Sequence, residues 1–223
     1  MGSVIGDILP LALGVAISPV PIIAAILMLL SPRSKSPSVA FLIGWVAGIV
    51  VALTLFTLLG SLIPEQDGDA TRPVSGVIKI LIGLALGVLA ARQWRRRPED
   101  GAEAALPGWM ARIDSMTAGR STVVSLRLSA GDPKNLVLMV GTGVVIGGAG
   151  LTVGGVTVVI VVFTIIAAST VLIPVVGYLI APGRMQRPFE RARVWLVQNY
   201  AATMAVLLFV LGIVLVGKGI ADF

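Results

Sequence analysis

The 223-residue sequence contains no cysteine and no histidine, and few charged residues. The missing cysteines exclude disulfides and cysteine-ligated metal sites, and the missing histidines remove the usual proton carrier near pH 7. The sequence also has no G-x-x-x-x-G-K-[ST] loop, no metal-ligand cluster and no pair of residues spaced for catalysis. We therefore expect no metal, no other cofactor and no enzymatic activity, and we expect any transport to be secondary rather than ATP-driven.

The scarcity of charged residues also indicates whether the chain is soluble in water or lies in a membrane. Charged residues make up 13% and hydrophobic residues 57% of the sequence, and the mean hydropathy is +1.00. A soluble domain carries about 25% charged residues. The composition therefore predicts an integral membrane protein. The net charge of +6 does not indicate nucleic-acid binding, because the basic residues gather in short loops beside apolar runs.

Long apolar runs predict an all-α, polytopic membrane protein with six transmembrane helices. Residues 135–181 carry no charge over 47 positions, which is too long for one crossing of about 20 residues. The glycine-rich segment 147–155 is therefore predicted to separate spans 4 and 5. The other spans are expected at residues 8–30, 39–63, 74–91 and 194–217.

The basic residues predict the orientation of these spans. With six spans, the loops after spans 1, 3 and 5 share one side and contain 13 of the 17 Lys and Arg residues. The positive-inside rule places that side in the cytoplasm. We therefore expect both termini outside.

The loop after span 3, residues 92–127, holds two further features. Its cluster of Arg95, Arg96 and Arg97 is either a topology determinant or a weak binding site for anionic lipid head groups. A possible helical face within it is formed by Trp109, Met110, Ile113 and Met116. Such a face fits either a helix on the inner membrane surface or an ordinary packed connector.

Two short motifs predict an internal repeat. SPVP stands at residues 18–21 and DPKN at 132–135, and aligning Pro19 with Pro133 gives an offset of 114 residues. Each unit then holds three spans, so the second unit is inverted relative to the first. We expect residues 1–91 to form the first repeat, 92–127 a cytoplasmic basic loop, and 128–223 the inverted repeat. Inverted repeats with broken helices are typical of secondary transporters.

The same motifs supply the candidate site. Ser18 and Asp132 each precede a proline, as an N-cap precedes the first helical turn. Because proline has no N–H, Pro19 and Pro21 should break span 1 and leave a helix N-terminus that attracts anions within the membrane. The candidate substrate-binding residues are Ser18, Pro19, Pro21, Asp132, Pro133, Lys134 and Asn135.

Two of these residues are ionisable within the predicted bundle. Asp132 is the candidate proton-coupling group, and Lys134 the candidate partner of Asp132 or of an anionic head group. The structural alternative is that Asp132 caps span 4 and Lys134 extends to the membrane interface.

Glycine pairs and polar residues occur within the predicted spans. The pairs Gly44/Gly48, Gly83/Gly87 and Gly143/Gly147 permit close helix contact, within the chain first and in a homodimer as the alternative. The other polar residues in the spans include Thr54, Thr57, Thr142, Thr164, Ser169, Thr170 and Asn199.

With these motifs and this topology, the chain resembles the lysine-exporter superfamily. Its segments PLALGVAISPVPIIAAILML and SAGDPKNLVLM are most similar to the peptidoglycolipid- or sulfolipid-addressing proteins of actinobacteria. The resemblance covers nearly the whole chain and implies a multi-pass protein of the bacterial inner (plasma) membrane. For this branch it implies help in moving cell-envelope glycolipids or related amphiphiles outward. Amino-acid-exporting relatives usually have glycine between the prolines of the first motif, where this chain has Val20. That departure argues against an amino-acid substrate.

Three functions remain open at this point. The first is a secondary transporter that exports or flips an anionic lipid or glycolipid and is coupled to protons. The second is an exporter of a small polar solute such as an amino acid or ion. The third is a non-transporting membrane adaptor for a larger lipid-export machine. Membrane lipids are expected partners in each case, and nucleic acid is not.

Overall fold

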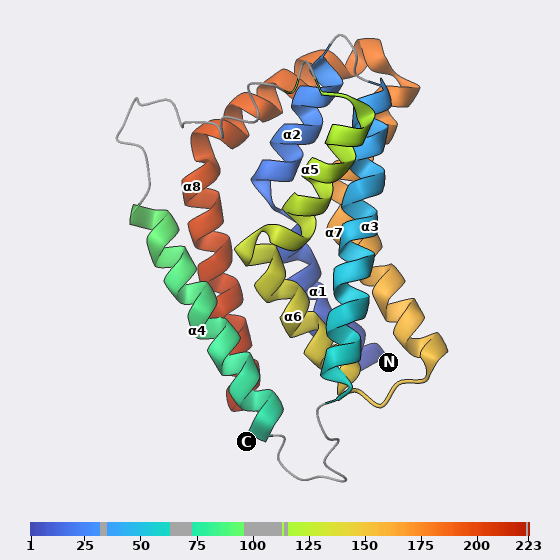
Figure 1. Ribbon diagram of the computed structural model, residues 1–223. Coiled ribbons are helices and arrows are strands. Elements are labelled where there is room, and N and C mark those ends of the chain that lie inside the picture. The colour runs from blue at the N-terminus through green and yellow to red at the C-terminus, as the bar shows by residue number, and fades with distance from the viewer. Residues whose placement is uncertain (32–34, 63–72, 96–112, 114–115, 222) are drawn as a thin grey trace.

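The computed structural model describes residues 1–31, 35–62, 73–95, 113, 116–221 and 223 (Figure 1). All regular structure in this part of the chain is helical, which confirms the all-α fold class, and it comprises eight α-helices. The helices are α1 Gly2–Ala16, α2 Pro19–Leu30, α3 Lys35–Gly60, α4 Pro73–Arg95, α5 Ala118–Gly131, α6 Pro133–Gly147, α7 Val153–Ile180 and α8 Pro182–Ile220.

Length and hydropathy mark some of these helices as membrane spans. Four are long and apolar enough to cross a bilayer: α3, α4, α7 and α8. The pair α1 and α2 passes the same test together but bends by 50°, which gives up to five spans. Span 4 of the six expected spans is not confirmed by this criterion. It corresponds to α6, which has only 15 residues, and the preceding helix α5 carries Arg120 and Arg127.

Several expected boundaries are corrected by the structure. The first span begins at Gly2 rather than residue 8, and the last apolar run belongs to a 39-residue helix that begins at Pro182 rather than residue 194. The helix α5 begins at Ala118, inside the segment 92–127 that was expected to be a loop. Serine and arginine lower the hydropathy of α5, so an apolar-run criterion does not detect it.

The proposed surface helix of that loop falls mostly outside the described residues. Trp109 and Met110 are not described, whereas Ile113 is buried and Met116 packs against the hydrophobic core. These two side chains therefore contact the protein interior rather than a membrane surface.

Small residues bring α3 close to α5. The buried serines of α5 are Ser121, Ser125 and Ser129. A Cβ on Gly44 would lie 2.7 Å from the carbonyl oxygen of Thr122, and a Cβ on Gly48 would meet the side chain of Ser129. Because neither position leaves room for a methyl group, glycine is what allows α5 to lie against α3.

Gly143, Gly147 and Gly83 also make close contacts within the chain, whereas a Cβ on Gly87 would meet nothing within 4 Å. A Cβ on Gly143 would lie 2.7 Å from the carbonyl oxygen of Phe56, and one on Gly147 would lie 2.6 Å from that of Thr57, so α6 packs closely on α3. A Cβ on Gly83 would lie 2.7 Å from the carbonyl oxygen of Gly212, where α4 packs on α8. Figure 1 shows α4 and α8 side by side at one edge of the bundle.

The hydrophobic core joins α1, α2, α3, α4, α6, α7 and α8, with Trp45, Phe41 and Phe163 among its largest fully buried side chains. Many large apolar side chains nevertheless face outward, including Val51, Leu81 and Ile173. An apolar exterior around a packed core is what a bilayer, rather than water, accommodates.

Candidate functional site

The first interruption in the bundle lies between α1 and α2. Ser18 is the N-cap residue of α2, in an extended conformation with ψ of 111°, and Pro19 is the first helical residue. Pro19 lacks the N–H that would bond four residues back, and the extended backbone of Ser18 before it separates the two helices. Ser18, Pro19 and Pro21 are buried, and the Ser18 side chain makes no capping hydrogen bond.

The second interruption, between α5 and α6, has nearly the same backbone form. Asp132 is its N-cap residue, with ψ of 121°, and Pro133 follows as the first helical residue. Unlike Ser18, Asp132 caps the helix: its Oδ1 accepts hydrogen bonds from the N–H groups of Lys134 at 2.9 Å and Asn135 at 3.4 Å. The geometry therefore agrees with the structural alternative for Asp132, in which this residue caps a helix.

Lys134 connects the two interruptions. Its Nζ donates a hydrogen bond of 2.7 Å to the carbonyl oxygen of Gly14 near the end of α1, and its side chain is only 5% exposed. The expectation that Lys134 extends to the membrane interface is therefore wrong. A cationic side chain at this position also complements the negative end of the α1 dipole.

A second side chain supports the same helix end. Thr170 of α7 donates its hydroxyl hydrogen to the carbonyl oxygen of Ala16 at 2.6 Å. The N–H groups of Ile17 and Ser18 bond to the carbonyls of Leu13 and Val15. The last four carbonyls of α1, which a helix end normally leaves unpaired, are thus all satisfied, two of them by α6 and α7. We call Gly14, Ala16, Lys134 and Thr170 the junction.

Asn135 lies beside the junction and is fully buried. Its Nδ2 donates to the carbonyl oxygen of Leu128 at 3.0 Å, which fastens the start of α6 to α5. Its Oδ1 has no hydrogen-bond partner among the residues that the structure describes. This oxygen is an acceptor available to a water molecule or to a donor group of a ligand.

The geometry does not offer α6 as an anion site. Pro133 has no N–H, Lys134 and Asn135 donate theirs to Asp132 Oδ1, and the N–H of Leu136 bonds to the Asp132 carbonyl oxygen. In α2 the prolines at positions 19 and 21 remove two of the first donors. Anion binding at the start of α6 would therefore require rearrangement, and α2 has fewer donors at its start than an ordinary helix.

The predicted head-group cluster is only partly described. Arg95 is exposed at the end of α4, while Arg96 and Arg97 lie outside the described residues. Among the residues that the structure does describe, no group of carboxylates could hold a metal ion.

The break residues can be identified from the sequence, but their contacts cannot. Thr170 stands out in the sequence only as a polar residue in an apolar span. Nothing in the sequence indicates that the acceptors are main-chain carbonyls of α1.

A comparison with known protein families identifies the family of this chain. A family model described as "Sap, sulfolipid-1-addressing protein" matches residues 8–221. The chain belongs to this family. Neither a curated protein nor a solved structure matches it. The family match includes both interruptions and all of the junction, and it confirms the sulfolipid-addressing branch of the resemblance. Membership of the wider lysine-exporter superfamily stays a prediction.

Proposed function

We propose that the protein is a secondary transporter, not an enzyme, that exports or flips an anionic lipid or cell-envelope glycolipid across the bacterial inner membrane. Its membership of the sulfolipid-1-addressing protein family supports a lipid as substrate. The observation that carries the transport mechanism is the hydrogen bond between Lys134 and Gly14, because it joins two interrupted helices inside an apolar bundle. Broken helices that meet near the membrane midplane are the usual setting of a secondary transporter's site.

The proposal includes six crossings arranged as inverted repeats. Six arise when α1 with α2, and α5 with α6, each count as one interrupted span. Helix pairing supports this reading: α1 packs on α7 as α5 packs on α3, and α2 packs on α8 as α6 packs on α4. The starts of α2 and α6, at Pro19 and Pro133, share the 114-residue offset of the sequence repeat.

The orientation in this proposal has both termini outside. Both lie at the same end of the bundle (Figure 1), as an even number of crossings requires. The first part of α8 runs along the opposite end, and its exposed basic residues are Arg184, Arg187, Arg191 and Arg193. By the positive-inside rule that end is cytoplasmic.

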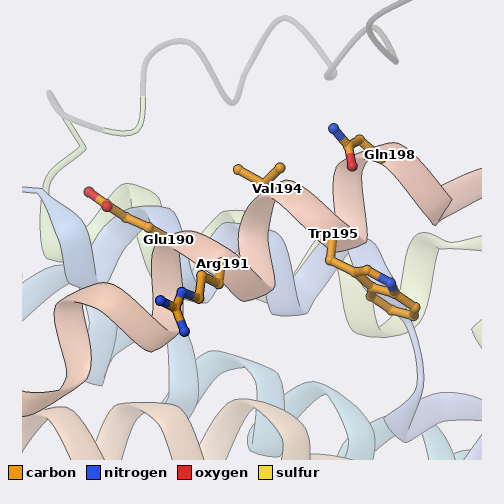
Figure 2. Close-up of a pocket in the computed structure, with 5 residues that line it drawn as sticks. All are labelled: Glu190, Arg191, Val194, Trp195 and Gln198. Atoms are coloured by element: carbon orange, nitrogen blue, oxygen red, sulfur yellow. The ribbon is translucent and has the colours of Figure 1, made fainter. Parts of the chain in front are cut away.

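The same stretch of α8 suits a membrane interface. A shallow cavity of about 330 Å³ is lined there by Glu190, Arg191, Val194, Trp195 and Gln198 (Figure 2). Figure 2 shows Glu190, Val194 and Gln198 along the upper edge of the helix and Arg191 and Trp195 along its lower edge. Tryptophan and arginine at the end of a bundle are typical of the head-group region.

In the proposed mechanism the junction is the pivot between the two halves. It holds the end of α1, in the first half, to α6 and α7 in the second. Protonation of Asp132 would weaken its acceptance of the Lys134 and Asn135 N–H groups and so loosen the start of α6. A proton gradient would in this way act on the helix that carries Lys134.

The test is a flux assay with the purified protein in proteoliposomes. Fluorescent anionic lipid analogues are compared with radiolabelled amino acids, with and without an imposed proton gradient. Wild type is compared with Asp132→Asn, and Asp7→Asn serves as the control because it changes a partly exposed acid outside the junction. We expect lipid movement that Asp132→Asn abolishes and Asp7→Asn preserves.

Other outcomes separate the competing functions. Amino-acid flux without lipid movement would replace this proposal with export of a small polar solute. Movement of neither substrate under any gradient would favour a non-transporting adaptor for a larger lipid-export machine.

A further inference from the structure

A cavity of about 740 Å³ lies between the C-terminal half of α3, the end of α6 and the N-terminal half of α7. Ligand sites typically enclose about 300–1,000 Å³. The described residues that line this one are mainly aliphatic and none is charged. Among them Leu58, Val153 and Ile165 are also exposed on the outer surface. The cavity is therefore continuous with the apolar exterior, where membrane lipid has direct access.

Two threonine hydroxyls in this apolar wall are unpaired. Thr57 and Thr164 line the cavity, are 5% and 7% exposed, and their Oγ1 atoms have no hydrogen-bond partner in the described part of the chain. Helical threonines commonly bond to the carbonyl four residues earlier, as Thr142 and Thr157 do at 2.8 and 2.9 Å. A buried hydroxyl without a partner is destabilising, so these two are available to a ligand.

We infer that this cavity binds one acyl chain of an ester lipid, with the hydroxyls of Thr57 and Thr164 donating to its ester carbonyl oxygen. The aliphatic wall matches the chain, and the two donors match a group that only accepts hydrogen bonds. The ester carbonyl oxygen has two lone pairs and can therefore accept from both hydroxyls at once. The inference rests on the proposed function only in taking a membrane lipid as ligand.

The location of the cavity indicates the step of export at which it would bind lipid. The C-terminal ends of α3 and α6 lie at the same end of the bundle as the N-terminus (Figure 1), which is the outer end in the proposed orientation. A lipid held there is in the outer leaflet, so the site would receive the product of outward movement.

The experiment is photo-crosslinking of the purified full-length protein in nanodiscs. The probe is a phosphatidylglycerol with a diazirine beside the ester carbonyl, compared with an ether-linked analogue that lacks this carbonyl, and labelled peptides are mapped by mass spectrometry. We expect labelling within residues 46–61 and 146–165, with the ester probe labelling about fivefold more than the ether probe, the ratio that one net hydrogen bond gives.

Matched variants make the test specific. The pair Thr57→Val and Thr164→Val should reduce the ester-to-ether ratio to about one, whereas Thr142→Val should preserve it because that hydroxyl bonds to Leu138 outside the cavity. Val161→Trp, at a partly exposed lining position, should lower labelling by both probes. Each single threonine variant repeats the measurement if the double variant does not fold.

Equal labelling by ester and ether probes in wild type would overturn the inference, as would labelling spread evenly over the lipid-facing sides of α4 and α8. A fall in the ratio with Thr142→Val as large as with the cavity variants would overturn it too. Because binding is measured without transport, a protein that binds the probe but moves no lipid refutes the proposed function and leaves this site in place.

Discussion

Replacing Lys134 with methionine should destabilise the fold through the carbonyl that it leaves behind. Methionine has a similar length and shape but cannot donate a hydrogen bond. Gly14 would lose its 2.7 Å partner, and the N–H of Ser18 cannot replace it because it already bonds to Val15. An unsatisfied buried carbonyl costs about 1–3 kcal/mol. Removing the amine also relieves the cost of burying it, so we expect a net loss of about 1–2 kcal/mol.

The measurement is unfolding by sodium dodecyl sulfate in mixed micelles, followed by far-ultraviolet circular dichroism. Lys218→Met is the control, because Lys218 pairs with Asp7 at 2.6 Å where the two side chains are 33% and 42% exposed. An exposed ion pair contributes about 0–1 kcal/mol, so this variant should lose less stability. A Lys134→Met protein as stable as wild type, or a larger loss with Lys218→Met, would refute the role assigned to the junction.

Thr170→Val extends the same reasoning, since it removes the partner of the neighbouring Ala16 carbonyl. If both side chains hold one helix end, their effects should be coupled by roughly 0.5 kcal/mol or more. Strict additivity of Lys134→Met and Thr170→Val would show that the two bonds act independently.

Three further predictions follow from the described contacts. Gly147→Ala should destabilise by about 1–3 kcal/mol because its Cβ would meet α3 backbone, whereas Gly87→Ala, with nothing within 4 Å, should be neutral or stabilising; equal effects in the same unfolding titration would contradict the packing. Asp132→Ala should cost about 1 kcal/mol while Asp132→Asn keeps the cap, so a large loss of stability with asparagine would mean that capping is not the main structural role. In this cysteine-free chain, Arg193→Cys should react with an impermeant thiol reagent only from the cytoplasmic side and Phe223→Cys only from outside; the reverse pattern would invert the topology.

Composition and proline chemistry made the interrupted helical fold predictable. Pro19 and Pro133 each follow a residue type that favours an N-cap, Ser18 and Asp132, so the two breaks can be located without coordinates. Proline alone would not locate them, since Pro10, Pro174 and Pro188 lie inside continuous helices. The helix α5 could not be found in the same way. Its burial depends on serines that fit against Gly44 and Gly48 of α3, and such shape complementarity between distant segments has no signature in a hydropathy pattern.

The candidate site was predictable in its residues and not in its bonds. Ionisable residues beside a proline break pointed to Asp132 and Lys134, and an N-cap role for Asp132 follows from local sequence alone. The acceptor for Lys134 is a backbone carbonyl 120 positions earlier, and every residue has such a carbonyl, so no side-chain pattern could select Gly14. The unpaired hydroxyls of Thr57 and Thr164 depend in the same way on rotamers and neighbours.

The junction and the cavity respond differently to loss of a polar group, and this difference separates structural from ligand-binding roles. At the junction the Lys134 amine donates to the Gly14 carbonyl oxygen. Removing the amine leaves this buried carbonyl without a hydrogen bond, so the stability of the fold falls. In the cavity the hydroxyls of Thr57 and Thr164 have no partner among the described residues, so replacing them with valine should leave stability unchanged or raise it. A polar group that lowers the stability of the unliganded protein is typical of a functional site, where stability and activity trade off. A rise in stability together with a loss of ester preference would therefore assign these hydroxyls to the lipid rather than to the fold.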